Sequence, residues 1–203
     1  TIEAGTRYDR DLNEQEALLH TFASSSCQGV NHHIFSQLKD FAHSNQTVDV
    51  VAVRGVSGCG KSTLLATLAQ HCMLELGHHT DHIYYCLQPW HRQQDILSCL
   101  IAQLDRGIVE REQAHGKCLT ARSLTTGLSR HAQTRTKDVL IIADGLLSSG
   151  IEDLVIFAVK QHNAWSAKSG YRHRVRLILG TIPAERHSPS DVLSLAILPL
   201  MPS

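Results

Sequence analysis

The stretch VVAVRGVSGCGKSTLLATLAQ, residues 50–70, is the strongest indication of the expected fold. It begins with a short apolar run, which is typical of a strand buried on both faces. A glycine-rich turn follows, and leucines at helical spacing come after Lys61 and Ser62. The segment therefore predicts a strand, a loop and a helix in succession.

Residues 55–62, GVSGCGKS, fit the pattern G-x-x-x-x-G-K-[ST] of a phosphate-binding loop. A loop that surrounds a triphosphate turns its backbone N–H groups inward, which favours small or absent side chains. Lys61 is expected to reach the β and γ phosphates, and the Ser62 hydroxyl to be a ligand of Mg²⁺. The predicted nucleotide-binding residues are Gly55, Ser57, Gly58, Cys59, Gly60, Lys61, Ser62 and Thr63.

A second part of the site is predicted from the segment VLIIAD, residues 139–144. Its last residue, Asp144, lies at the carboxyl end of an expected central strand, where open α/β sheets bind ligands. We predict that Asp144 completes the Mg²⁺ site with Ser62, and that Lys61 and Asp144 are the catalytic residues. The alternative is an ordinary turn aspartate before Gly145.

The remaining chain predicts strands that alternate with helices. We expect further strands at residues 82–87, 174–181 and 193–198, and helices at 61–76, 93–107, 119–133 and 149–165. This order predicts an α/β fold, a doubly wound, mainly parallel sheet of about five strands flanked by helices. We assign residues 1–45 to a lead-in segment and residues 46–203 to the nucleotide-binding core. Within the lead-in, a helix is predicted at 34–42, and residues 14–22 show only weak helical periodicity.

Composition narrows the expected partners and compartment. Lys plus Arg and Asp plus Glu are 19 each, so no net charge attracts nucleic acid or an anionic membrane. No apolar run approaches the length of about 18 residues that suggests a membrane span. The six cysteines include no CxxC pair, which favours free thiols, a reducing compartment and a cytoplasmic location. The 14 histidines would make the chain cationic if half were protonated.

The order of these segments resembles the P-loop core of the STAND class of NTPases, which includes NACHT and NB-ARC domains. The nearest similarity is to NACHT-like modules of the nephrocystin-3 and telomerase-protein-1 type. It extends over about residues 30–203 and rests on RGVSGCGKSTLLATLAQ, HIYYCLQPWHRQQDILSCLIAQL, VLIIADGLL, VRLILGTIP and LSLAILPL.

This resemblance implies ATP, or less often GTP, bound with Mg²⁺ in a P-loop NTPase core. It implies a regulatory module whose nucleotide state controls a conformational change or self-assembly, with other domains of a longer protein as partners. The chain has no initiator methionine, so we expect it to be a segment of a longer protein. The helical lid and winged-helix segments of such proteins would follow residue 203.

The sequence departs from the family pattern at the positions that control hydrolysis. Family members place one or two acids soon after the aspartate, but here Gly145 is followed by Leu-Leu-Ser-Ser, and a displaced base would have to be Glu152 or Asp153. The strand that often ends in an arginine ends here at Thr181. Because phosphoryl transfer depends on positioning and charge stabilisation, we predict nucleotide binding with slow or no hydrolysis.

Two other functions stay open. The first alternative is a non-catalytic scaffold that binds nucleotide structurally, and the second is a small-molecule kinase, although the arginines form no compact lid.

Cys59 precedes a helix N-terminus, which favours a reactive thiolate and a redox switch. The other interpretation of Cys59 is that this position accepts any small side chain.

Overall fold

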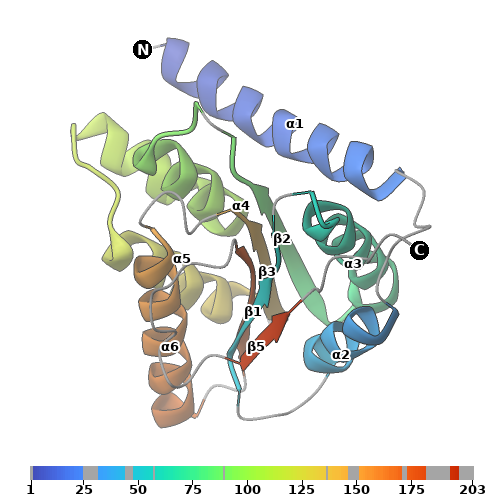
Figure 1. Cartoon of the computed structure of the whole chain (residues 1–203). Helices are drawn as coiled ribbons and strands as arrows, with labels where there is room; N and C mark the ends of the chain where they lie inside the picture. The colour runs from blue at the N-terminus through green and yellow to red at the C-terminus, as the bar shows by residue number, and fades with distance from the viewer. Residues whose placement is uncertain are drawn as a thin grey trace.

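The structure, a computed structural model, describes residues 2–24, 32–43, 48–56, 58–88, 90–135, 137–145, 151–170, 173–181 and 193–196. Its elements are α1 (Ile2–Ser24), α2 (His32–His43), β1 (Val50–Arg54), α3 (Lys61–Leu76), β2 (Thr80–Cys86), α4 (Gln93–Ala114), α5 (Ala121–Thr134), β3 (Asp138–Asp144), α6 (Glu152–Ser169), β4 (Val175–Thr181) and β5 (Leu193–Ala196). The strands form one five-stranded sheet with helices on both faces (Figure 1). The predicted α/β class is confirmed.

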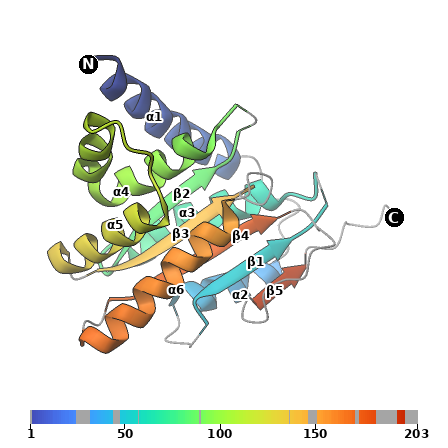
Figure 2. The ribbon, with the colours of Figure 1, turned by 90° about the vertical axis from the view of Figure 1, so that its left-hand side faces the viewer.

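All strand pairs are parallel, and the strand order is β2-β3-β4-β1-β5 (Figure 2). Strand β4 therefore separates β1, which leads into the phosphate-binding loop, from β3, which ends at Asp144. In register, Gly180 of β4 lies beside both Asp144 and Val53. Because the strands are parallel, their carboxyl ends meet at one edge, and the predicted site residues come together there.

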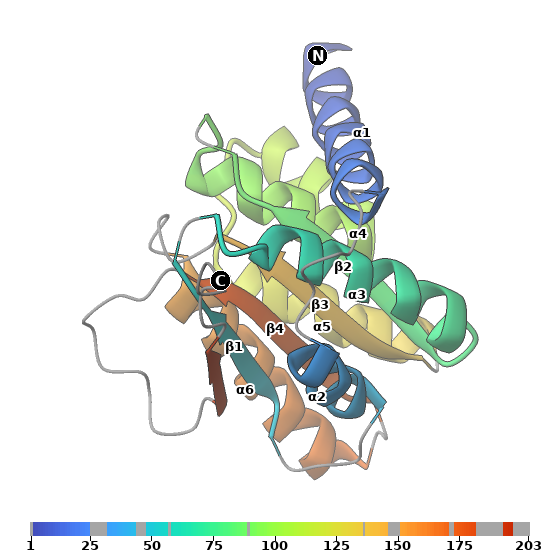
Figure 3. The same cartoon turned by 45° about the vertical axis from the view of Figure 1, so that its right-hand side comes forward.

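Strand β3 shows how the strands contribute to two apolar layers. Val139 and Ile141 of β3 face the layer built with α4, α5 and α6, whereas Leu140 and Ile142 face the layer that contains α2 and α3. Figure 3 shows α3 and α6 on opposite sides of the sheet. Burial on both faces explains why the strands are nearly continuous apolar runs rather than alternating ones.

The helix predicted to end at Gly107 is interrupted two residues before that end, and a second helical segment that the sequence did not predict follows it directly. Helix α4 continues to Ala114 across a kink at Asp105, whose φ and ψ are −154° and 96°. The Asp105 carboxylate accepts a hydrogen bond from the Gly107 N–H at 3.0 Å. Ile108 and Val109 are then buried in the core. Their packing holds the second helical segment of α4 against the core.

Helix α1 is also longer than its weak periodicity predicts, and it covers the outer edge of the sheet. The Gln15 side chain donates to the Cys86 carbonyl oxygen at 3.2 Å and accepts from the Cys86 N–H at 2.6 Å. An edge strand presents unpaired backbone groups of this kind, and proteins protect them. Gln15 therefore takes the place of a neighbouring strand at the end of β2.

The described part of the chain has five cysteines, all of them free thiols: Cys59, Cys72, Cys86, Cys99 and Cys118. This agrees with the free thiols expected from sequence, while Cys27 lies outside the described residues. Among the helices described, none combines the length and the apolar character needed to cross a membrane.

Candidate nucleotide-binding site

The loop between β1 and α3 has the backbone that a phosphate cradle needs. Gly58 and Gly60 have φ of 79° and 85°, a region that L side chains rarely adopt. Gly60 is also the N-cap of α3, and no side chain in the described part of the chain caps this helix. The first N–H groups of α3 therefore face the loop without a side-chain acceptor, as in anion-binding helix termini. Ser57 lies outside the described residues.

The Lys61 side chain folds back across the loop. Its Nζ donates to the carbonyl oxygens of Gly55 at 2.6 Å and Val56 at 3.0 Å, and lies 3.8 Å from Cys59 Sγ. Only 9% of Lys61 is exposed. The ammonium group is thus held inside the loop by neutral acceptors, which a phosphate oxygen can replace with a stronger, charge-assisted bond.

The second predicted contact joins two segments 82 residues apart in sequence, because the Ser62 hydroxyl donates a hydrogen bond to Oδ2 of Asp144. Asp144 is buried, with 6% of its surface exposed. Burial raises the pKa of Asp144, and the Ser62 hydrogen bond and the Lys61 charge act against this rise. The carboxylate therefore lies in a poorly solvated position, where a bound cation stabilises its charged form.

Space for this carboxylate comes from Gly180 on the neighbouring strand. A Cβ at Gly180 would lie 2.3 Å from Oδ1 of Asp144 and 2.6 Å from Cδ1 of Leu65. The sequence predictions did not include Gly180, although a glycine inside an apolar strand is a signal of close approach. Gly145 then turns the chain with φ 84° and donates its N–H to the Gly180 carbonyl oxygen at 2.9 Å.

These residues enclose a cavity of about 390 Å³ at the carboxyl edge of the sheet. Its lining consists of Gly58, Gly60, Lys61, Ser62, Thr63, Asp144 and Gly145. Hydroxyl and carboxylate oxygens are the ligands that Mg²⁺ prefers, and the loop and helix terminus suit phosphate. Most of the predicted binding residues are thus brought to one cavity, and their chemistry fits a nucleotide with Mg²⁺. Gly55 and Cys59 are not in this lining, but both contact the Lys61 side chain.

The candidates for a displaced base lie at the start of α6. Burial, with a smaller effect of Asp153, raises the pKa of Glu152, and Arg54 at the end of β1 lowers it. The Glu152 carboxylate therefore lies within the electrostatic reach of β1. Thr181, which stands where an arginine is common, is buried, and its hydroxyl has no hydrogen-bond partner in the described part of the chain.

The fold is similar to solved structures of larger proteins. "Structure of Drosophila ORC bound to DNA" matches with a TM-score of 0.59 and 15% identity, over 90% of this chain and 46% of that chain. "Structure of the Aeropyrum Pernix ORC2 protein (ADPNP-ADP complexes)" matches with a TM-score of 0.48 and 20% identity, over 84% and 40% of the two chains. At such identities the first likeness shows the fold alone, and this chain spans less than half of that relative.

No curated protein matches the sequence. A family model described as "Nephrocystin 3, N-terminal" matches residues 25–156, which is well over half of the 203 residues. The matched segment contains the whole phosphate-binding loop, Asp144 and the start of α6. The resemblance to the nephrocystin-3 type is therefore confirmed, and the chain belongs to the nephrocystin 3 N-terminal family, with the fold of a P-loop NTPase.

Proposed function

We propose that this chain binds a nucleoside triphosphate with Mg²⁺ and acts as a slowly hydrolysing regulatory switch. The observation that carries the proposal is the hydrogen bond between Ser62 and Asp144 beside the phosphate-binding loop. It aligns a hydroxyl and a carboxylate oxygen at one point of the cavity. Ser62 is then a direct ligand of Mg²⁺, and Asp144 holds the ion through water, as Mg²⁺ keeps several waters in such sites.

The phosphates are bound by groups that already point into the loop. Lys61 exchanges the carbonyl oxygens of Gly55 and Val56 for oxygens of the β and γ phosphates. The N–H groups at the start of α3 add partial positive charge. The base is proposed to be adenine, or alternatively guanine.

Hydrolysis is proposed to be slow because no acid follows Asp144 closely. Residues 145–151 are Gly-Leu-Leu-Ser-Ser-Gly-Ile, so the first carboxylate is that of Glu152. Loss of a group that orients the attacking water removes orders of magnitude in rate while binding is retained. Turnover by this chain is therefore expected to be weak.

The same observation favours a second function, a scaffold that binds nucleotide and never hydrolyses it. A kinase is less well supported, since Arg106, Arg130 and Arg135 each pair with a carboxylate outside the cavity lining. If the chain is a switch or a scaffold, its expected partners are other domains of a longer protein or a second copy of the chain.

One experiment separates these functions. Purified protein is titrated calorimetrically with ATP, ADP and GTP in Mg²⁺, and phosphate release is measured in parallel with and without a small-molecule acceptor. Binding with slow release supports the switch. Binding without any release, also in the longer protein, supports the scaffold, and release that depends on the acceptor supports a kinase. Absence of binding to all three nucleotides contradicts the proposal.

A further inference from the structure

A row of three buried histidines lies at the amino end of the sheet, opposite the nucleotide cavity. His131 belongs to α5, His162 to α6, and His173 lies just before β4. Their exposed fractions are 3%, 0% and 6%. The row begins at Asp81, near the start of β2. Buried histidines are normally satisfied by backbone or carboxylate partners, whereas here they bond to one another.

Three hydrogen bonds connect this row, which we call the histidine chain (Asp81, His131, His173 and His162). Nε2 of His131 lies 2.8 Å from Oδ2 of Asp81. Nδ1 of His131 lies 3.1 Å from Nε2 of His173, and Nδ1 of His173 lies 3.1 Å from Nε2 of His162. Each nitrogen pair needs one N–H and one lone pair, so the protonation states of the rings depend on one another.

Only one arrangement of protons satisfies all three bonds when the rings are neutral. A neutral imidazole has one donor and one acceptor, and the ionised Asp81 carboxylate only accepts. His131 therefore carries its proton on Nε2 and accepts at Nδ1 from His173, which in turn accepts at Nδ1 from His162. All three rings are Nε2–H tautomers. The last lone pair, on Nδ1 of His162, has no partner in the part of the chain that the structure describes.

We propose that the histidine chain is a pH-sensitive latch, which holds α5 and α6 against the amino end of the sheet while it carries at most one added proton and releases them on further acidification. One added proton is tolerated. It binds Nδ1 of His162, the Nε2 proton of His162 passes to Nδ1 of His173, and the Nε2 proton of His173 passes to Nδ1 of His131. The positive charge then lies on His131 beside Asp81. A second proton places two N–H donors against each other at 3.1 Å, and the chain breaks.

The surroundings of the chain oppose this second proton. Burial, with the charges of the neighbouring histidines, lowers the pKa of His162 and of His173 from 6.5 to about 4. Asp138 and Asp81 raise the pKa of His173, but less strongly. The charged and titratable groups that interact with the chain or with its neighbouring acids are Asp81 and His82 on β2, Arg135 on α5, Lys137 before β3, Asp138 on β3, Arg174 before β4 and Arg176 on β4.

These acids already have cationic partners. Asp81 pairs with Arg135 at 2.8 Å and with Lys137 at 3.4 Å, and Asp138 pairs with Arg176 at 3.5 Å. Little negative charge is left to balance an imidazolium at His162 or His173. In the unfolded chain both rings take up protons near pH 6.5, and in the folded chain only near pH 4. Stability therefore falls as the pH falls from 6.5 towards 4.

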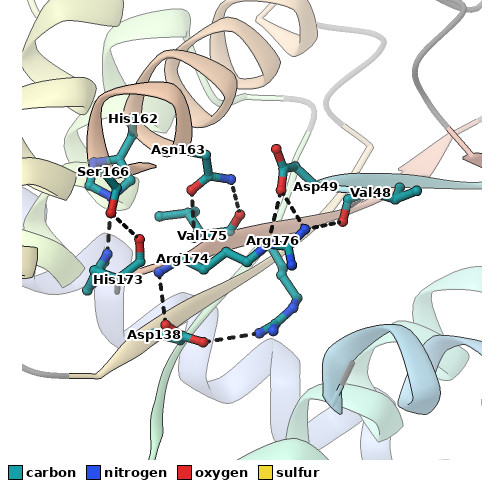
Figure 4. Close-up of polar contacts among 10 residues, drawn as sticks. All are labelled: Val48, Asp49, Asp138, His162, Asn163, Ser166, His173, Arg174, Val175 and Arg176. Atoms are coloured by element: carbon teal, nitrogen blue, oxygen red, sulfur yellow. Dashed lines mark hydrogen bonds and ion pairs between the residues drawn. The ribbon is translucent and has the colours of Figure 1, made fainter. Parts of the chain in front are cut away.

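The latch acts on α6 because two further side chains bind the same segment (Figure 4). The Asn163 amide donates to the Val175 carbonyl oxygen at 2.8 Å and accepts from the Val175 N–H at 2.9 Å. Ser166 donates to the carbonyl oxygen of His173 at 2.7 Å. Displacement of His173 therefore disturbs the polar contacts between α6, the helix that follows Asp144 in sequence, and the start of β4.

Two measurements test the latch. The first is ¹⁵N NMR of histidine-labelled protein at pH 7.5, which reports the tautomer of each ring. We expect Nε2–H tautomers at His131, His162 and His173. Nδ1–H tautomers, or free titration of His162 and His173 near pH 6.5, would overturn the proposal. This measurement uses the wild-type protein alone, so it does not depend on the folding of a variant.

The second measurement is urea unfolding between pH 7.5 and 5.5 for the wild type, His162→Gln and His78→Gln. In His162→Gln the side-chain amide keeps a donor near the place of Nε2 but takes up no proton. The urea midpoint of this variant is expected to fall about two thirds as much as that of the wild type, because one of three rings whose pKa is lowered to about 4 (His82, His162 and His173) is removed. His78 is exposed and serves as the control, with wild-type behaviour expected. An equal fall for His162→Gln and wild type contradicts the latch.

Discussion

The carboxylate of Asp144 occupies the space that a side chain at Gly180 would fill. A Cβ at this position would lie 2.3 Å from Oδ1 of Asp144, while the other oxygen of the carboxylate accepts from Ser62. The metal-binding half of the candidate site therefore depends on a residue that has no functional group. The close approach of Asp144 also explains why β4, the strand between β1 and β3, has glycine at Gly180 within a mostly apolar sequence.

Gly180→Ala is expected to damage both stability and nucleotide binding. The new methyl group meets Leu65 as well as Asp144, so one of them must move, at a cost of about 1–3 kcal/mol in the free energy of unfolding. Displacement of Asp144 also removes the Mg²⁺ dependence of nucleotide affinity. Urea unfolding and calorimetry at two Mg²⁺ concentrations measure the two effects.

Gly127→Ala is the matched control for this variant. Gly127 lies within α5, and its Cβ would meet only side-chain atoms at 3.6 Å or more. An alanine inside a helix is favoured over glycine by about 0.5–1 kcal/mol, so this variant should be as stable as the wild type or more stable. If the two variants behave alike, the close contact at Gly180 is not the cause.

Lys61→Ala is expected to lower triphosphate affinity by about tenfold to a hundredfold, since charge-assisted hydrogen bonds contribute about 1.5–3 kcal/mol. The loss is partial because alanine removes the ammonium group while the helix terminus remains. Calorimetry with ATP measures the loss, and Lys117→Ala, an exposed lysine outside the cavity, serves as control. Unchanged affinity would refute the cradle assignment.

Gln15→Ala tests whether α1 protects the edge of the sheet. Removal of the amide leaves the buried N–H and carbonyl groups of Cys86 without their partner, which costs about 1–3 kcal/mol of unfolding free energy. Urea unfolding followed by circular dichroism measures the difference. Gln70→Ala, at an exposed position of α3, should change stability little. If Gln15→Ala is as stable as Gln70→Ala, the contact is dispensable.

Alkylation of Cys59 is expected to block nucleotide binding, because Sγ lies 3.8 Å from Nζ of Lys61. A maleimide adduct displaces the ammonium group from the loop. Burial raises the pKa of Cys72, Cys86 and Cys99 to about 12, so these thiols react slowly at pH 8.

The experiment uses protein in which Cys27 and Cys118 are replaced by serine, and bound ATP should protect Cys59. The same protein carrying Cys59→Ser provides the unreactive control. ATP binding that survives complete modification of Cys59 would favour the other interpretation, a position that merely accepts a small side chain.

The sequence predicts those parts of the molecule whose cause is local. The loop at residues 55–62, the buried strands and Asp144 follow from patterns of a few neighbouring residues, and the structure brings Ser62 and Asp144 into contact as the pattern implies. The family resemblance adds the order of the elements. The second helical segment of α4, after the kink at Asp105, is not predicted, because it depends on the burial of Ile108 and Val109 in the core.

Other features depend on pairs of residues far apart in sequence, so a local pattern does not identify both partners. Gly180 matters only because β4 lies beside β3, and Gln15 only because α1 crosses the end of β2. The histidine chain joins β2, α5, α6 and the residue His173 before β4, so the sequence shows the high histidine content but not the arrangement of the rings.

The proposed function depends above all on Ser62 and Asp144 forming the Mg²⁺ half of a nucleotide site. Calorimetric ATP affinity with Mg²⁺ and with EDTA, for the wild type and Asp144→Asn, measures this role. We predict that Mg²⁺ strengthens ATP binding by the wild type at least about tenfold, or about 1.4 kcal/mol, and strengthens binding by Asp144→Asn far less. An equal Mg²⁺ effect in both proteins, or no ATP binding by the wild type, would contradict this assignment.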